Sequence, residues 1–159
     1  MEIKHIDCGI ERADKIYHIS DVHIRTLKRH QEYRSVFENM FDYIARTSTA
    51  NSIAVVTGDI VHSKLEMSPE LVRMLTNFFN GFNIPTIVIL GNHDMNLNNT
   101  YREDALSPVL DMIKNPNIFF VKDNGLFDFA GITWNHMAVD VEPKHYVNAK
   151  SFDAEYRKI

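Results

Sequence analysis

Three short polar segments carry the residue types from which a metal site could be built. They are Asp21-Val22-His23, Gly58-Asp59-Ile60-Val61-His62 and Gly91-Asn92-His93-Asp94. Carboxylate and amide oxygens together with imidazole nitrogens suit Mn²⁺, Fe²⁺ or Zn²⁺ better than Ca²⁺. Side chains two residues apart in an extended segment leave it on the same side, so Asp21 and His23 can bind one ion together.

The residue types within these segments predict separate tasks. The carboxylate of Asp59 has two oxygens and can bridge two ions, while Gly58 allows a tight turn and a close backbone approach. Asn92 offers a neutral oxygen to the second ion. His93 can face the substrate as an acid, and Asp94 is expected to fix its tautomer and raise its basicity.

Each polar segment directly follows a predicted buried strand, at about 15–20, 52–57 and 86–90. Ligands in open α/β sheets bind beyond the carboxyl ends of the strands, so the three segments are expected to converge on one rim. Apolar spacing predicts helices over about 29–46 and from Pro69, after an N-cap at Ser68, to a stop at Pro85.

The pattern changes after the third polar segment. A further helix is expected over about 104–114, followed by short strands at 118–121, 126–130 and 132–135, and the start of a helix within 151–159. Strands and helices alternate first and short strands follow, which predicts an α/β fold with a parallel sheet extended by antiparallel elements.

Composition supports one globular domain without naming its activity. The chain has 159 residues and a net charge of −4, so no basic surface announces nucleic-acid binding. The single cysteine, Cys8, excludes an internal disulfide and fits a reducing compartment. The N-terminus has no secretory pattern and the apolar runs are strand-sized, so a soluble cytoplasmic protein without membrane contact is expected.

Taken singly, each polar segment has an ordinary explanation. An Asp-x-His tripeptide recurs by chance, a Gly-Asp pair is common in turns, and Gly-Asn-His-Asp can be a polar loop. All three in this order, each at a strand end, are much less expected by chance.

At these residues the chain resembles the calcineurin-like metallophosphoesterases, whose pattern runs D-x-H, G-D and G-N-H-D or G-N-H-E. The resemblance implies an α/β/β/α sandwich and two divalent ions, Mn²⁺ before Fe²⁺, Zn²⁺ or Mg²⁺. It further implies that Asp21 and His23 bind the first ion, Asp59 bridges both and Asn92 binds the second. His93 would protonate the leaving oxygen of the scissile phosphate.

Two details resemble the SbcD/Mre11 nuclease branch. Phosphatases of the superfamily usually carry an Asp-Arg pair where this chain has Val61-His62-Ser63, and His62 follows Asp59 at the nuclease spacing. Asp104-Ala105-Leu106-Ser107-Pro108 is similar to phage and large-virus members. The resemblance implies DNA as substrate, a homodimer and an SbcC/Rad50-like ATPase partner. The alternative interpretation of His62 is a turn residue near the metals with no catalytic part.

The family pattern normally ends with a later lone histidine and a Gly-His-x-His segment, neither of which is present. His136 and His145 lack that context and are interpreted as ordinary polar residues. Residues 1–159 are therefore expected to be the N-terminal part of a metallophosphoesterase domain, with too few ligands for tight metal binding. A phosphatase of the same superfamily and a catalytically incomplete binding module remain alternatives to the DNA nuclease.

Overall fold

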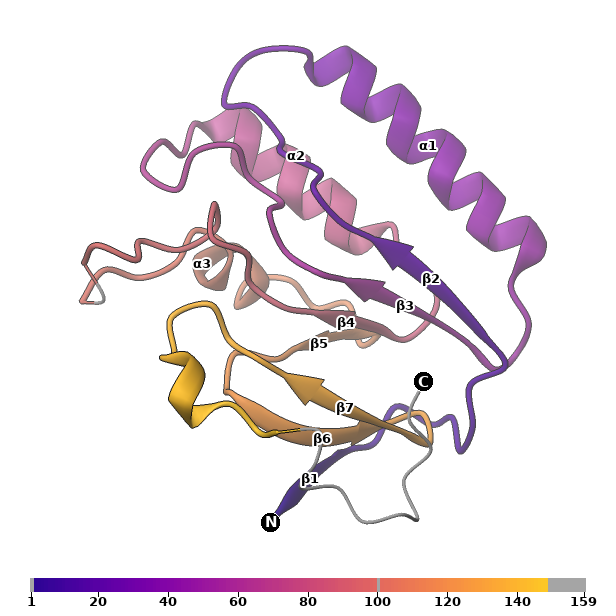
Figure 1. The fold of residues 1–159 in the computed structure, drawn as a ribbon. Coiled ribbons are helices and arrows are strands. Elements are labelled where there is room, and N and C mark those ends of the chain that lie inside the picture. The colour runs from indigo at the N-terminus through magenta and orange to yellow at the C-terminus, as the bar shows by residue number, and fades with distance from the viewer. Residues whose placement is uncertain (1, 100, 149–159) are drawn as a thin grey trace.

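The computed structural model describes residues 2–99 and 101–148, which form three layers (Figure 1). A helical layer covers one face of a four-stranded sheet, and the other face of that sheet packs against a second sheet of three strands. An α/β architecture is thereby confirmed. The helix expected within 151–159 lies outside the described residues.

The four-stranded sheet is entirely parallel, in the order β2-β3-β4-β5. Its strands are β2 (Lys15–Ile19), β3 (Ser52–Val56), β4 (Thr86–Val88) and β5 (Ile118–Phe120). All five residues of β3 are buried, as its continuous apolar sequence predicts for a central strand covered on both faces.

Of the expected short strands, β5 joins this sheet, but the two that follow it do not extend it with antiparallel elements. They belong to a second sheet, in agreement with the sandwich that the resemblance implies. β6 (Gly125–Phe129) and β7 (Ile132–His136) form an antiparallel hairpin, and β1 (Ile3–Ile6) joins β6 in parallel. The two sheets pack face to face because each has an apolar face. Between them lie buried side chains from both sheets, namely Ile53, Val55, Ile87, Phe127 and Phe129.

Two long helices build the helical layer, α1 (His30–Thr47) and α2 (Pro69–Asn80). Ser68 caps α2, since its hydroxyl accepts a hydrogen bond from the Leu71 amide at 3.2 Å. The buried aromatic rings of Phe37 and Phe78 lie 4.8 Å apart between the two helices. No helix in the described part of the chain has the length and apolar character needed to cross a bilayer.

The helix expected over about 104–114 is much shorter. Only α3 (Ser107–Leu110) forms, and a short 3₁₀ helix, η1 (Pro143–His145), follows β7. After Leu110 the backbone tightens, because the Met112 and Ile113 amides bond three residues back instead of four. The tighter turns end the helix, and Asn115 then bonds the Phe79 and Phe82 carbonyls on the way to β5.

Candidate metal centre

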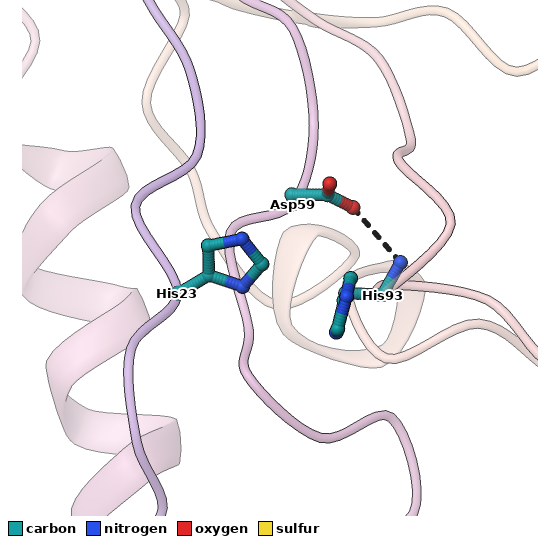
Figure 2. Close-up of side chains that lie close together, drawn as sticks. All are labelled: His23, Asp59 and His93. Carbon is teal, nitrogen blue, oxygen red and sulfur yellow. Dashed lines mark hydrogen bonds between the residues drawn. The ribbon is translucent and has the colours of Figure 1, made fainter.

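Three side chains from three different loops meet beyond the carboxyl ends of β2, β3 and β4. Ligand atoms of His23, Asp59 and His93 all lie within 4.8 Å of one another (Figure 2). The rings of His23 and His93 are perpendicular, with centroids 4.6 Å apart. We call His23, Asp59 and His93 the metal cluster. The predicted convergence of the three polar segments on one rim is thus observed.

The backbone at the cluster is held in an unusual conformation. Asp21, His23 and Asp59 have φ values of 53°, 49° and 53°. This left-handed region costs a residue other than glycine about 1–3 kcal/mol, so tertiary contacts must hold it in place. One such contact is the hydrogen bond from the His23 amide to the Asp59 carbonyl, at 2.9 Å. The phenol of Tyr33 donates to the His23 carbonyl at 2.8 Å.

Two glycines bring the second and third loops together. Gly58 has φ 84°, and a Cβ added there would lie 2.2 Å from the Gly91 nitrogen. A Cβ on Gly91 would lie 2.2 Å from Asp59 Oδ1. The prediction that Gly58 permits a close approach is confirmed. Because the loops touch, the His93 amide donates to Asp59 Oδ1 at 2.8 Å (Figure 2).

Asp94 does not hold the His93 ring, and that prediction is corrected. Its carboxylate is fully buried and accepts hydrogen bonds from the amides of Ile60, Val61 and Gly91 at 2.9, 3.0 and 2.9 Å. Burial raises the pKa of Asp94, and these amide bonds only partly oppose the rise. Asp94 therefore ties the loop after β3 to the loop after β4.

A backbone carbonyl orients His93 instead. Nδ1 of His93 donates to the His62 carbonyl at 3.2 Å, which leaves Nε2 with a free lone pair. Metal-binding histidines commonly donate their second ring nitrogen to a carbonyl in this way. His93 was predicted as a catalytic acid, and its position among the ligand atoms also fits it as a metal ligand.

The other predicted site residues surround the cluster. Asp21 lies beside it, with Oδ1 at 3.8 Å from His23 Nε2 and a largely exposed side chain that accepts from the Ser20 hydroxyl. His62 is exposed, and its ring stacks beside that of His93 at 6.2 Å. Asn92 is exposed, and its backbone carbonyl accepts a hydrogen bond from Lys64 Nζ at 3.1 Å.

The sequence interpretation missed two residues at this site. Tyr33 lies in the helix expected over about 29–46, and the sequence pattern does not show which group its phenol hydroxyl contacts. Lys64 follows Asp59 by five residues, but a lysine in a polar loop is ordinary. Both contact the backbone of a predicted ligand, Tyr33 at His23 and Lys64 at Asn92.

The donor set fits a divalent transition ion. Nδ1 of His23 is buried and has no hydrogen-bond partner, which is costly for a ring nitrogen unless something binds it. Two imidazoles and one carboxylate are ligands that Mn²⁺, Fe²⁺ and Zn²⁺ accept. The three ligand atoms of the cluster are fewer than two ions need, so Asp21 and Asn92 would have to turn inward to complete the set.

Comparison with known proteins agrees with this geometry. Residues 14–153 match the family described as calcineurin-like phosphoesterase. The chain is also 47% identical over 128 residues to an uncharacterized protein of Acanthamoeba polyphaga mimivirus, an alignment that covers 78% of this chain and 10% of the relative. This chain thus spans about a tenth of that relative's length. No solved structure matches this chain significantly. The chain belongs to the calcineurin-like phosphoesterases.

Proposed function

We propose that this domain hydrolyses phosphodiester bonds in DNA in a metal-dependent reaction. Its family indicates metal-dependent phosphoester hydrolysis, and DNA as the substrate is our addition to that assignment. The observation that carries the proposal is the trio of imidazoles from His23, His62 and His93, whose ring centroids lie 4.6–6.2 Å apart. His23 and His93 belong to the motifs that the superfamily shares, whereas His62 lies in the segment where phosphatases usually carry an Asp-Arg pair.

The residues of the cluster divide the chemistry between them. Asp59, His23 and Asp21 would hold one divalent ion, and Asp59 and Asn92 a second. Bound ions of this kind lower the pKa of a water and stabilise the charge that develops on phosphate oxygens. The ring of His93 lies beside that of His62, and either imidazole is placed to act as the acid that gives a proton to the leaving oxygen.

The finer expectations also stand as proposals. Mn²⁺ is the expected ion because oxygen and imidazole ligands are mixed in the set. The SbcD-type branch, the homodimer and the SbcC-type ATPase partner follow from the resemblance at His62 and at the stretch from Asp104 to Pro108. In the structure that stretch is an ordered cap: the Asp104 carboxylate accepts from the amides of Leu106 and Ser107.

A second candidate function is metal or phosphate binding without hydrolysis. Within the described residues, His23, Asp59 and His93 are the only group of three or more such side chains whose ligand atoms all lie within 4.8 Å of one another. Two ions that shared only these ligands would bind weakly. This small ligand set is the observation behind the binding role as an alternative.

The test is Mn²⁺-dependent cleavage of linear DNA by this chain, with His93→Ala as the site variant. His145→Ala is the matched control, because that side chain is exposed and is not part of the cluster. We expect cleavage that requires Mn²⁺, is lost in His93→Ala and persists in His145→Ala. Hydrolysis of small phosphoesters alone would reject the nuclease in favour of a phosphatase. Mn²⁺ binding with no hydrolysis of either substrate would favour the binding role.

A further inference from the structure

A cavity of about 520 Å³ adjoins the metal cluster. It lies between α1 and the segment that follows β2, and Asp21 and His23 line it. A phosphate held at the cluster would therefore have its substituent at the mouth of the cavity. The volume is in the range of small-molecule sites in proteins.

The inner wall of the cavity is apolar and partly aromatic. It is formed by Tyr33, Val36, Phe37 and Met40 of α1 together with Phe78 of α2. Val36 is 60% exposed, although it lies on the cavity side of an amphipathic helix. The Tyr33 ring is fixed from both sides, because its hydroxyl bonds the His23 carbonyl and its ring lies 5.9 Å from that of Phe37.

The mouth of the cavity is charged and polar. Arg29 donates two hydrogen bonds to the Glu32 carboxylate, so this pair presents both donors and acceptors. Arg25 also lines the mouth, and its guanidinium forms no hydrogen bond or ion pair with the described part of the chain. A cation with no carboxylate beside it complements an anionic ligand.

From these features we propose that the cavity binds the nucleoside part of a nucleotide whose phosphate lies at the metal cluster. The inference rests on the proposed function, since it places the phosphate at that site. A base can stack on the fixed Tyr33 ring and cover Val36 and Met40, and base stacking on aromatic side chains is favourable for every base. The sugar and base edges then face the Arg29–Glu32 pair, and Arg25 can meet a neighbouring phosphate.

The test compares three ligands that carry the same phosphate group, in Mn²⁺-loaded protein: thymidine 5′-monophosphate, phenyl phosphate and methyl phosphate. Calorimetry gives the affinities, and the Met40 methyl NMR signal, recorded with diamagnetic Zn²⁺ in place of paramagnetic Mn²⁺, reports occupation of the cavity. We expect thymidine 5′-monophosphate to bind at least ~10-fold more tightly than methyl phosphate, as one stacked base predicts. Only the two aromatic ligands should shift the Met40 signal, and phenyl phosphate should bind less tightly than the nucleotide.

A matched pair of variants tests the location. Val36→Trp fills the cavity from an exposed helix position and is expected to abolish the advantage of thymidine 5′-monophosphate over methyl phosphate. Asn39→Trp places the same ring on an exposed position of α1 that does not line the cavity, and should keep the advantage. Circular dichroism of both variants checks that the fold is retained.

The tests of the cavity and of the metal centre have different outcomes that would contradict them. Equal binding of methyl phosphate and thymidine 5′-monophosphate would overturn the cavity assignment and leave the metal centre standing. Phenyl phosphate binding as tightly as the nucleotide would overturn the nucleoside assignment in favour of a generic apolar site. If no phosphate ligand bound to the Mn²⁺-loaded protein, the proposed function would fall together with the cavity.

Discussion

Residues at the rim of the parallel sheet and in the hairpin of the second sheet adopt the same left-handed backbone conformation, but the conformation has a different role in each place. Asp21, His23 and Asp59 at the rim have φ near 50°, and so does Ala130 between β6 and β7, with φ 53°. In the hairpin Ala130 is followed by Gly131 at φ 68°, and two consecutive positive φ values are what a tight two-residue hairpin turn requires.

The difference lies in what stabilises the conformation. The hairpin turn is local and is supported by the ladder between β6 and β7 on either side of it. The rim has only the short backbone pairing around Ile24 and Val61, and its further support comes from residues far along the chain. Asp94 bonds Ile60 and Val61, and Gly91 lets the loops touch. Strain held by remote contacts is characteristic of functional sites, whereas strain in a hairpin is part of the turn.

The largest expected effect is that of Asp59→Ala. Asp59 is the only carboxylate in the metal cluster and accepts a hydrogen bond from the His93 amide. Even the partners that merely orient metal ligands are worth roughly 10–100-fold in metal affinity, so loss of a direct ligand should weaken Mn²⁺ binding by more than about 100-fold. Calorimetric titration with Mn²⁺ measures this, and unchanged affinity would remove Asp59 from the site.

Gly91→Ala should come next, because it breaks the support of the rim without removing a ligand. The added Cβ would lie 2.2 Å from Asp59 Oδ1 and 2.3 Å from the Asp59 nitrogen, so the loop must shift. A displacement of about 1 Å costs roughly 100-fold in rate, and we expect a loss of that size in Mn²⁺-dependent hydrolysis. Gly9→Ala is the control for backbone strain without a clash, since Gly9 has φ 75° and nothing lies within 4 Å of its added Cβ. Equal rates for both variants would contradict the tight packing.

Lys122→Met tests a second buried carboxylate, away from the cluster. Burial raises the pKa of Asp104, but hydrogen bonds from Lys122 and Ser107 together outweigh burial and lower it. Stability from a lowered carboxyl pKa is complete above the unfolded value and is lost as the pH falls through the folded value. The variant should lose about 1 kcal/mol at neutral pH and begin its acid unfolding at higher pH. Urea titrations at several pH values measure both, and an unshifted acid transition would contradict the pairing.

Ala130→Gly has the smallest expected effect. Glycine adopts positive φ without the steric cost that alanine bears, so the variant should gain about 0.5 kcal/mol of stability. Hydrolysis should be unchanged, because the turn lies far from the rim. Thermal unfolding and the hydrolysis assay check the two expectations, and a loss of activity would show that the hairpin and the rim are coupled.

The sequence predicted the rim well because its signals are local. Each polar segment directly follows an apolar run, and the parallel arrangement of such strands brings their ends together. The N-cap of α2 at Ser68 and the spacing of α1 are likewise readable within a few turns. The coarse fold class and the convergence of His23 and Asp59 with His93 needed nothing else.

What the sequence did not predict depends on distant contacts. β1 was missed because its partner is β6, with Ile3 paired to Leu126 far along the chain, and four residues alone carry little strand signal. The helix at 104–114 was predicted too long because the turns after Leu110 tighten and Asn115 then bonds the carbonyls of Phe79 and Phe82, which precede β4. The role of Asp94 was misassigned because its carboxylate accepts hydrogen bonds from amides 33 and 34 residues earlier in the chain. Nothing in the sequence around Asp94 indicates those partners.

The central claim, that a divalent ion binds to His23 and Asp59 beside the His93 ring, is tested most directly by NMR of the imidazole signals during a Mn²⁺ titration. Paramagnetic Mn²⁺ should broaden the signals of His23 and His93 first and that of neighbouring His62 with them. His136, whose Nδ1 bonds the Asp123 carbonyl, and the exposed His145 should stay sharp at the same Mn²⁺ concentration. Uniform broadening of all histidines, or early broadening of His136 or His145 alone, would contradict the account.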